Sequence, residues 1–365
     1  EYPLCQTTHC MGINYEIFEK ADALQYLDFE TRTWTSDGFM KACAAIAASG
    51  LVETPGIIYC GGQGGDQGTR ALVTNLCGAR FTNEDYTEYT INSPEGIRAL
   101  ETLKGMVDAG ILSCDTHIQA SDELKLFTQG KTAMTLAWNY SNEKQYASNV
   151  EFTPYAVAFP TPEGMEPRLC GGIWGFGVFD SGDAERIEAS KTLIRFLCDD
   201  EVQGRKSVRA TGFCPVRSSF RDVYDGTPEE QRINNYRIMM KYMSDYYNIT
   251  PGWAAQRTVW WIMLQQVFSG SDIKISADEY VMLANNSINN TPLDFSKNRI
   301  DADARRILFI SSYSLSYPNV GDQIDGIRSG LKPDEYLHCE FMDSSSASGD
   351  VYVEAFYNYI TFKYS

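Results

Sequence analysis

Apolar and polar positions along the first part of the chain alternate as expected for short strands followed by helices. INYEIFEK (13–20) is predicted to be a strand that turns into a helix. IIYC (57–60) is predicted to be a buried strand that enters the glycine cluster GGQGGDQG (61–68). A helix is predicted over 93–110, with Ser93 as its N-cap and glycine at its end. Further strands are predicted within 133–138, 150–164 and 171–180. This alternation indicates an α/β fold.

The rest of the chain separates into a helical part and a second α/β part. From Asp183 to about Thr291 the periodicity is helical almost throughout. Residues 291–305 lie in a stretch of Asn, Pro and mixed charges with little periodicity, so they are predicted to be a linker. Beyond the linker, a strand, a helix, a second strand and a second helix are predicted at 306–314, 320–331, 336–343 and 351–364. These elements predict a partial Rossmann-like α/β domain over 306–365.

The charge balance narrows the choice of partners. With 48 acidic and 31 basic residues among 365, the formal net charge is −17. Such a chain does not attract phosphate backbones, so nucleic acid is not expected as a partner. No apolar run approaches the ~18 residues that span a membrane, and the first residues, EYPLCQTTHC, lack the regions of a signal peptide. Because the chain has no initiating methionine, we expect it to be a fragment of a longer protein.

The ten cysteines are scattered rather than concentrated in a short scaffold, which predicts mostly reduced, buried thiols. No C-x-x-C pattern occurs. Cys5, His9 and Cys10 have the spacing of half a metal site, but no second pair lies at ligand spacing. We therefore expect no metal.

The sequence contains no recognisable catalytic or nucleotide-binding motif. The string GKT (130–132) is not a phosphate-binding loop, because that motif needs glycine where Lys125 stands. The glycine cluster does not fit G-x-G-x-x-G, so no nucleotide cofactor is expected. None of the three histidines stands in a hydrolase motif. We expect a binding protein rather than an enzyme, although a catalytic carboxylate pair set by three-dimensional spacing would leave no such motif.

Several aromatic residues stand beside Gly, Asn or Pro instead of in apolar runs: Trp138, Tyr140, Trp174 and Trp253. Aromatic rings stack on the flat C–H faces of sugars, so this pattern favours a neutral carbohydrate ligand. Packing in the core is the alternative interpretation. Trp253 and Arg257 are four residues apart and would share a helix face.

An ordered set of segments resembles extracellular solute-binding proteins of the maltose- and oligosaccharide-binding type, which serve ABC transporters. The segments are YEIFEKA (15–21), SPEGIRALETLKGMVDAGIL (93–112), LFTQGKTAMTLAWNY (126–140), AFPTPEG (158–164), GGIWGFGVF (171–179), ASKTLIRFLCDDEVQ (189–203) and TGFCPVR (211–217). The resemblance implies a periplasmic-binding-protein-like fold over 1–290, in which two α/β lobes joined by hinge crossings close on a sugar. It places the second lobe at about 4–170 and the helical return of an incomplete first lobe at about 178–290. Closure on a ligand is therefore expected to be weak or absent in this chain.

The same resemblance assigns side chains to the ligand. Tyr140 occupies the aromatic position after G-K-T-A-M, with Trp138 as a neighbour, and Trp174 lies in the returning hinge strand. Trp253 and Arg257 resemble the late aromatic helix. The polar ligand loop corresponds to Gly61–Gln67, and the residues assigned there are Gly64, Asp66 and Gln67.

The tail carries a second resemblance. ILFISSYSLSYPNVGDQIDGIRSGL (307–331) and CEFMDS (339–344) are similar to the start of the periplasmic-binding-protein-like sensor domains of bacterial signalling proteins. Ser312, Tyr313 and Asp343 would lie at carboxyl ends of strands, where such sheets bind ligands, or would cap those ends.

Three functions remain open from the sequence. The chain is expected outside the cytoplasm as the sugar-binding input of a membrane-anchored sensor that acts on a signalling module. Alternatively, it delivers sugar to an ABC permease. A glycan-acting enzyme is the third possibility.

Overall fold

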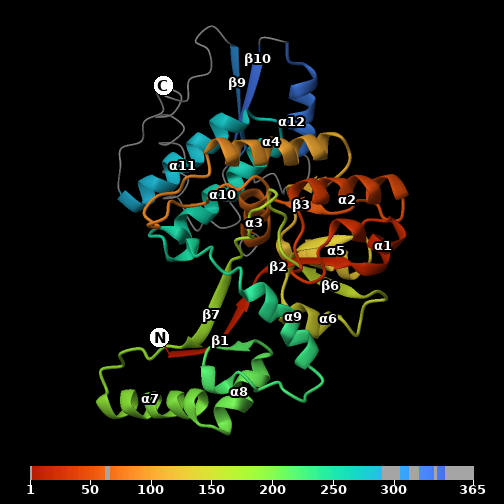
Figure 1. Ribbon diagram of the computed structural model, residues 1–365. Coiled ribbons are helices and arrows are strands. Elements are labelled where there is room, and N and C mark those ends of the chain that lie inside the picture. Colours follow the sequence, from red (N-terminus) through yellow and green to blue (C-terminus); the bar gives the residue numbers. More distant parts are fainter. Residues whose placement is uncertain (1, 62–65, 290–304, 312–319, 333–334, 342–365) are drawn as a thin grey trace. The chain divides into compact units, whose positions relative to one another are not determined.

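The computed structural model describes residues 2–61, 66–289, 305–311, 320–332 and 335–341 (Figure 1). The chain forms two compact units. Unit 1 consists of Glu1–Glu53 and Leu124–Tyr246, and unit 2 consists of Thr54–Glu123 and Tyr247–Ser365. These units divide the chain at other points than the lobes expected from the sequence, because residues 54–123 group with the late helices.

One sheet of unit 1 has the strand order β5-β2-β6. The central strand β2 (Cys10–Asn14) is buried along its whole length and pairs antiparallel with both neighbours. Asn14 ends this strand and caps the following helix α1, because its side chain accepts a hydrogen bond from the Ile17 N–H. The predicted change from strand to helix within 13–20 is therefore confirmed. The other elements around this sheet are β5 (Met134–Trp138), β6 (Pro154–Val157), α1 (Tyr15–Lys20), α2 (Ser36–Ser49), α5 (Ala120–Thr128) and α6 (Tyr140–Tyr146).

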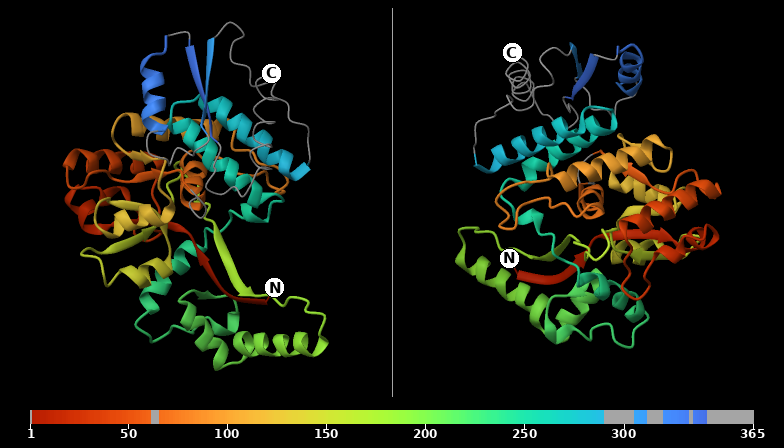
Figure 2. Two further views of the ribbon diagram at one scale, coloured as in Figure 1. Left: turned by 180° about the vertical axis from the view of Figure 1, so that it is seen from behind. Right: turned by 45° about the horizontal axis from the view of Figure 1, so that its top comes forward.

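The second sheet of unit 1 has the order β7-β1-β8. Strands β1 (Tyr2–Thr8) and β7 (Gly171–Phe176) are antiparallel and run side by side in Figures 1 and 2. Only His9 separates β1 from β2, and its N–H donates to the Cys170 carbonyl at 2.8 Å, directly before β7. The chain therefore passes between the two sheets twice at one place. The remaining elements are α7 (Ala184–Asp199), α8 (Gln203–Thr211), β8 (Cys214–Pro215) and α9 (Glu230–Met240).

Unit 2 contains a parallel pair of short strands and four long helices. Ser93 accepts a hydrogen bond from the Gly96 N–H and Pro94 begins helix α4, as the sequence predicts. Phe81 lies among other buried aromatic rings, with its centroid 5.1 Å from that of Trp260. The elements are β3 (Ile57–Tyr59), α3 (Asp66–Leu76), α4 (Pro94–Asp108), β4 (Ser113–Asp115), α10 (Trp253–Phe268) and α11 (Ile273–Asn289). A single turn of 3-10 helix lies at Tyr247–Ile249 in unit 2. Two further single turns lie in unit 1, at Leu24–Tyr26 and Ser218–Phe220.

The late part of unit 2 contains the predicted strand, helix and second strand. These are β9 (Arg305–Ser311), α12 (Val320–Ser329) and β10 (Glu335–Phe341), and the two strands are parallel. Val320, Ile324 and Cys339 form their small core. The helix predicted at 351–364 lies outside the described residues, as does the predicted linker except for Arg305.

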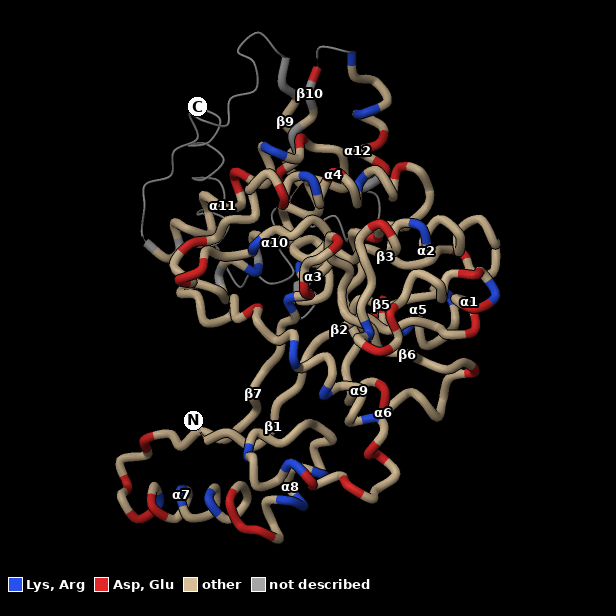
Figure 3. The backbone as a smooth tube through the Cα atoms, in the orientation of Figure 1, with Lys and Arg blue, Asp and Glu red and all other residues tan. Residues whose placement is uncertain are grey.

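The described residues contain neither a helix long and apolar enough to cross a membrane nor a group of three metal-ligating side chains. All ten cysteines are free thiols in this structure. Eight of them are buried, and this burial is as the sequence predicts. Acidic and basic residues are interspersed along α7, whereas the charged residues of α8 are all basic (Figure 3).

Candidate functional site

Trp174 and Phe213 form an aromatic pair in unit 1, in which Trp174 is exposed and Phe213 is half-buried. Trp174 lies on β7 with 58% of its surface exposed, and its ring stacks on Phe213 with a centroid distance of 6.3 Å and an interplanar angle of 9°. Strand β1 brings the rings together, because its Cys5 pairs with Trp174 on one side and with Pro215 on the other. The Trp174 ring therefore remains largely exposed to solvent while Phe213 packs against it.

Two glycines allow β7 to lie this close to β1. A Cβ atom on Gly175 would lie 2.1 Å from the Tyr2 carbonyl oxygen, and one on Gly171 would lie 2.3 Å from that of Thr7. Both distances are far below van der Waals contact, so only glycine fits at these positions. The glycines around Trp174 therefore serve strand pairing.

The first residue of β1 is anchored to the end of α7. The Tyr2 hydroxyl donates a short hydrogen bond to Asp199, and this contact raises the pKa of Tyr2. Arg217 forms an ion pair with Asp199 and donates from Nε to the Cys198 carbonyl at 3.0 Å. Its guanidinium also lies over the Tyr2 ring, 5.3 Å from the centroid.

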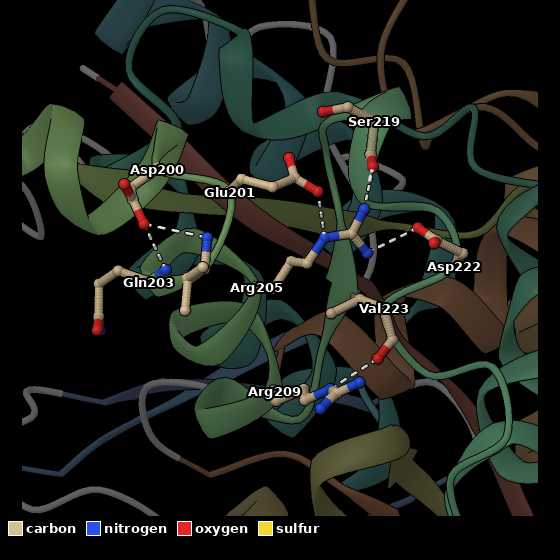
Figure 4. A network of polar contacts seen from close by, with 9 residues as sticks. Asp200, Glu201, Gln203, Arg205, Arg209, Ser219, Asp222 and Val223 are labelled. Atoms are coloured by element: carbon tan, nitrogen blue, oxygen red, sulfur yellow. Dashed lines mark hydrogen bonds and ion pairs between the residues drawn. The ribbon is translucent and has the colours of Figure 1, made fainter.

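A second polar network fixes α8, which directly precedes Phe213 (Figure 4). Arg205 donates to Glu201 and Asp222, each at 2.7 Å, and to the Ser219 carbonyl at 2.8 Å. Arg209 donates to the Val223 carbonyl at 2.7 Å. Because the acidic partners of Arg205 are exposed, these ion pairs contribute little stability. The hydrogen bonds to the Ser219 and Val223 carbonyls connect α8 to the segment that follows β8.

Trp138 and Tyr140, which the sequence suggests as ligand contacts, are both buried in unit 1. Trp138 is 0% exposed and packs edge-on against Phe127 with centroids 5.4 Å apart. Tyr140 is 1% exposed and packs edge-on against Tyr236 at 5.6 Å. Neither ring presents a free face in this structure. Ligand contact by these two rings stays a prediction, and core packing accounts for their present positions.

Near Tyr140, a largely buried carboxylate, whose side chain is 13% exposed, joins α6 to α9. Glu143 accepts a hydrogen bond from the Tyr236 hydroxyl at 2.7 Å and pairs with the Arg232 Nε at 3.3 Å. Burial raises the pKa of Glu143, although both partners oppose that shift. This group was not predicted from the sequence, since its partners lie about ninety residues away along the chain.

The remaining candidates belong to unit 2. Trp253 begins α10 and is 37% exposed, and the Arg257 guanidinium lies 5.2 Å from its ring centroid. The shared helix face predicted for this pair is therefore confirmed. Gln67 is half-buried in the first turn of α3. The backbone of Asp66 begins that helix, but its side chain is outside the described part, as are Gly64, Ser312, Tyr313 and Asp343.

Comparison with known proteins identifies the family. The profile of the bacterial extracellular solute-binding proteins matches residues 3–234. The chain therefore belongs to this family of extracellular binding proteins. No curated protein sequence matches it.

Solved structures confirm the periplasmic-binding-protein-like α/β fold. The chain is similar to the cyclic alpha-maltosyl-1,6-maltose binding protein from Arthrobacter globiformis, with a TM-score of 0.60 and 20% identity over 79% of this chain and 72% of that chain. It is also similar to an ABC transporter solute-binding protein from Thermotoga lettingae bound with alpha-D-tagatose, with a TM-score of 0.62 and 17% identity over 79% of this chain and 72% of that chain. For UgpB from Mycobacterium tuberculosis in complex with glycerophosphocholine, the TM-score is 0.61 and the identity is 14%, over 80% of this chain and 71% of that chain. Because the sequence identities are 20% or lower, these similarities show the fold alone.

Proposed function

We propose that the chain binds a carbohydrate or a related polar solute outside the cytoplasm, with Trp174 as a stacking surface. The observation that carries this proposal is the 58% exposed Trp174 ring, held at 9° to Phe213 on a hinge strand. A large aromatic ring is costly to leave in water, and a sugar face covers it well. Trp138, Tyr140, Trp253, Arg257, Gly64, Asp66 and Gln67 complete the proposed ligand contacts.

The solutes bound by proteins of the same fold support this ligand class. One similar structure is bound with maltose and another with alpha-D-tagatose, and a third is a chitin oligosaccharide binding protein. Glycerophosphocholine in another shows that the fold also holds a polar solute that is not a sugar. The ligand class proposed for this chain includes both kinds.

Binding of this type needs a change in shape and no covalent step. Strands β1 and β7 pair within the second sheet of unit 1, and the chain crosses to the first sheet next to both of them, at His9 and Cys170, as the two crossings of a hinge do. A solute that contacts both sides of the hinge shifts the open–closed equilibrium by its difference in affinity for the two states.

We further propose that this binding is the sensory input of a membrane-anchored bacterial signalling protein. The β9-α12-β10 segment supports this role, because it is a second parallel α/β element that follows the helices of the binding fold. Ser312, Tyr313 and Asp343 are the ligand candidates proposed for this segment. Delivery of a sugar to an ABC permease is the alternative, supported by the transporter proteins of the same fold. A glycan-acting enzyme would need a catalytic carboxylate pair and turnover.

Calorimetry of the natural, full-length protein with maltose, chitin and other oligosaccharides, tagatose and glycerophosphocholine tests the ligand class. Trp174→Ala is expected to weaken the affinity for the bound solute by about fivefold to 150-fold, since a stacked ring contributes about 1–3 kcal/mol. Phe179→Ala is the control, because Phe179 is 91% exposed in the same unit but is outside the pair. Equal affinity of the Trp174→Ala variant and the wild type would contradict the proposal.

A further inference from the structure

Two cysteine thiols of unit 2 lie in direct contact. The Sγ atoms of Cys60 and Cys114 are 3.8 Å apart, although 54 positions separate the residues in the sequence. Cys60 directly follows β3, and Cys114 is the middle residue of β4. In the parallel register Ile58 is opposite Cys114. Since alternate residues of a strand point to the same face, Cys60 and Cys114 are diagonal neighbours on one face of the pair.

The backbone at Cys60 is held from two sides. The Gln265 side-chain amide donates to the Cys60 carbonyl at 3.3 Å. The next residue, Gly61, donates its N–H to the Ile118 carbonyl at 3.0 Å, and a Cβ there would lie 2.8 Å from the same oxygen. The two thiols therefore stay close together, so little conformational freedom is lost when they are joined.

We propose that Cys60 and Cys114 form a disulfide when the folded chain meets an oxidising environment. A disulfide bond is about 2.05 Å long, so the two sulfur atoms, now 3.8 Å apart, need to approach by a little under 2 Å. The family to which the chain belongs is extracellular. Disulfides persist in that environment, whereas reducing systems keep cytosolic thiols free.

The reaction is a thiol–disulfide exchange with a small disulfide oxidant or an oxidised dithiol protein. Cys114 is half-buried and Cys60 is buried, so the Cys114 thiolate attacks the oxidant first and forms a mixed disulfide. Cys60 then attacks the Cys114 sulfur, and the second thiol of the oxidant leaves. Each cysteine loses one proton, and the oxidant gains two electrons and two protons.

The bond would join the end of β3 to β4 at the point where the glycine cluster 61–68 begins. It would also close a long segment of chain, and such cross-links stabilise mainly by restricting the unfolded state. The inference rests on the contact between the two thiols and on the family, and it is independent of which solute the protein binds.

The test exposes the natively folded protein to oxidised glutathione, blocks the remaining thiols with an alkylating reagent after unfolding, and maps peptides without reduction. We expect one linked peptide pair that contains Cys60 and Cys114, lighter than its two free peptides by two hydrogen atoms and separated again by dithiothreitol. The midpoint of thermal unfolding should rise on oxidation of the wild type.

Cys114→Ser and Cys60→Ser should each abolish both the linked pair and the rise of the midpoint. Cys43→Ser is the matched control, because Cys43 is fully buried in α2 of unit 1 and should leave both results unchanged. Complete alkylation of Cys60 and Cys114 after oxidation would overturn the proposal. A linked pair that joins other cysteines would overturn it as well.

Discussion

The hydroxyl of Tyr236 on α9 donates a 2.7 Å hydrogen bond to the carboxylate of Glu143 on α6, where Tyr236 is buried and the Glu143 side chain is 13% exposed. Helix α6 directly follows strand β5 of the first sheet of unit 1, whereas α9 follows the elements of the second sheet. The bond therefore adds a side-chain contact between two parts of unit 1 that are also joined through β1 and β7 and through the hydrogen bond from the Leu169 N–H to the Tyr242 carbonyl.

Tyr236→Phe should lower the free energy of unfolding by about 1–3 kcal/mol, because the buried Glu143 carboxylate loses a donor. Urea denaturation measures the difference. Tyr246→Phe is the control, since Tyr246 is 43% exposed and its hydroxyl donates only to the nearby Met243 carbonyl. If both variants lost the same free energy of unfolding, the hydrogen bond to Glu143 would contribute no more to stability than that of an exposed tyrosine.

The raised pKa of Glu143 gives a pH dependence of defined sign. Burial makes the folded state hold this proton more tightly than the unfolded chain, whose glutamates have a pKa of about 4.3. The contribution of Glu143 to stability is therefore fully present below the unfolded pKa and falls as pH rises through the folded pKa.

Glu143→Gln removes this titration but retains an oxygen that accepts from Tyr236. The stability of the variant relative to the wild type should therefore increase between about pH 4 and pH 7, as urea denaturation at each pH measures. The neighbouring groups whose charge or hydrogen bond acts on Glu143 are Tyr236, Arg232, Trp138 and Arg32. A relative stability that stays constant or decreases over this range would contradict the assignment.

Gly175→Ala should destabilise the pairing of β1 with β7 strongly. The added methyl group would lie 2.1 Å from the Tyr2 carbonyl oxygen, and backbone atoms cannot move aside without breaking the ladder. We expect a loss of at least about 2 kcal/mol in the free energy of unfolding. Gly177→Ala is the matched control, because no atom lies within 4 Å of its added Cβ. Equal stability of both variants would exclude a steric requirement at Gly175.

Sequence reasoning located elements where the signal is local. Ser93 and Pro94 predict the start of α4 because an N-cap and a first-turn proline act within one turn of helix. The strands and helix of 305–341 followed from apolar runs between turn residues. The division into two units could not be predicted in the same way, because it depends on contacts such as that between Tyr89 and Asn285, 196 positions apart.

The burial of Trp138 and Tyr140 could not be predicted from the residues next to them in the sequence. Asn139, the polar neighbour that suggested a ligand-facing loop, caps α6 by accepting a hydrogen bond from the Asn142 N–H at 3.0 Å. Its polarity serves the helix terminus. Phe213 was missed because its role depends on strand β1, which brings it against Trp174.

The stacking of Phe213 on Trp174 predicts that the two rings act on a solute as one unit. Phe213→Leu keeps an apolar side chain but removes the flat support, so the affinity for a stacked solute should fall about threefold to tenfold. Calorimetry of the full-length protein measures this change. Phe179→Leu, at an exposed position outside the pair, should leave the affinity unchanged.

The double variant Trp174→Ala with Phe213→Leu shows whether Phe213 orients the Trp174 ring or contacts the solute itself. If Phe213 acts by orienting Trp174, the double variant should bind no more weakly than Trp174→Ala alone, because the support has no ring left to orient. Additive losses would mean that each ring contacts the solute by itself. In that case the 9° stacking would reflect two neighbouring subsites, and Phe213 would be a binding residue rather than a positioning residue.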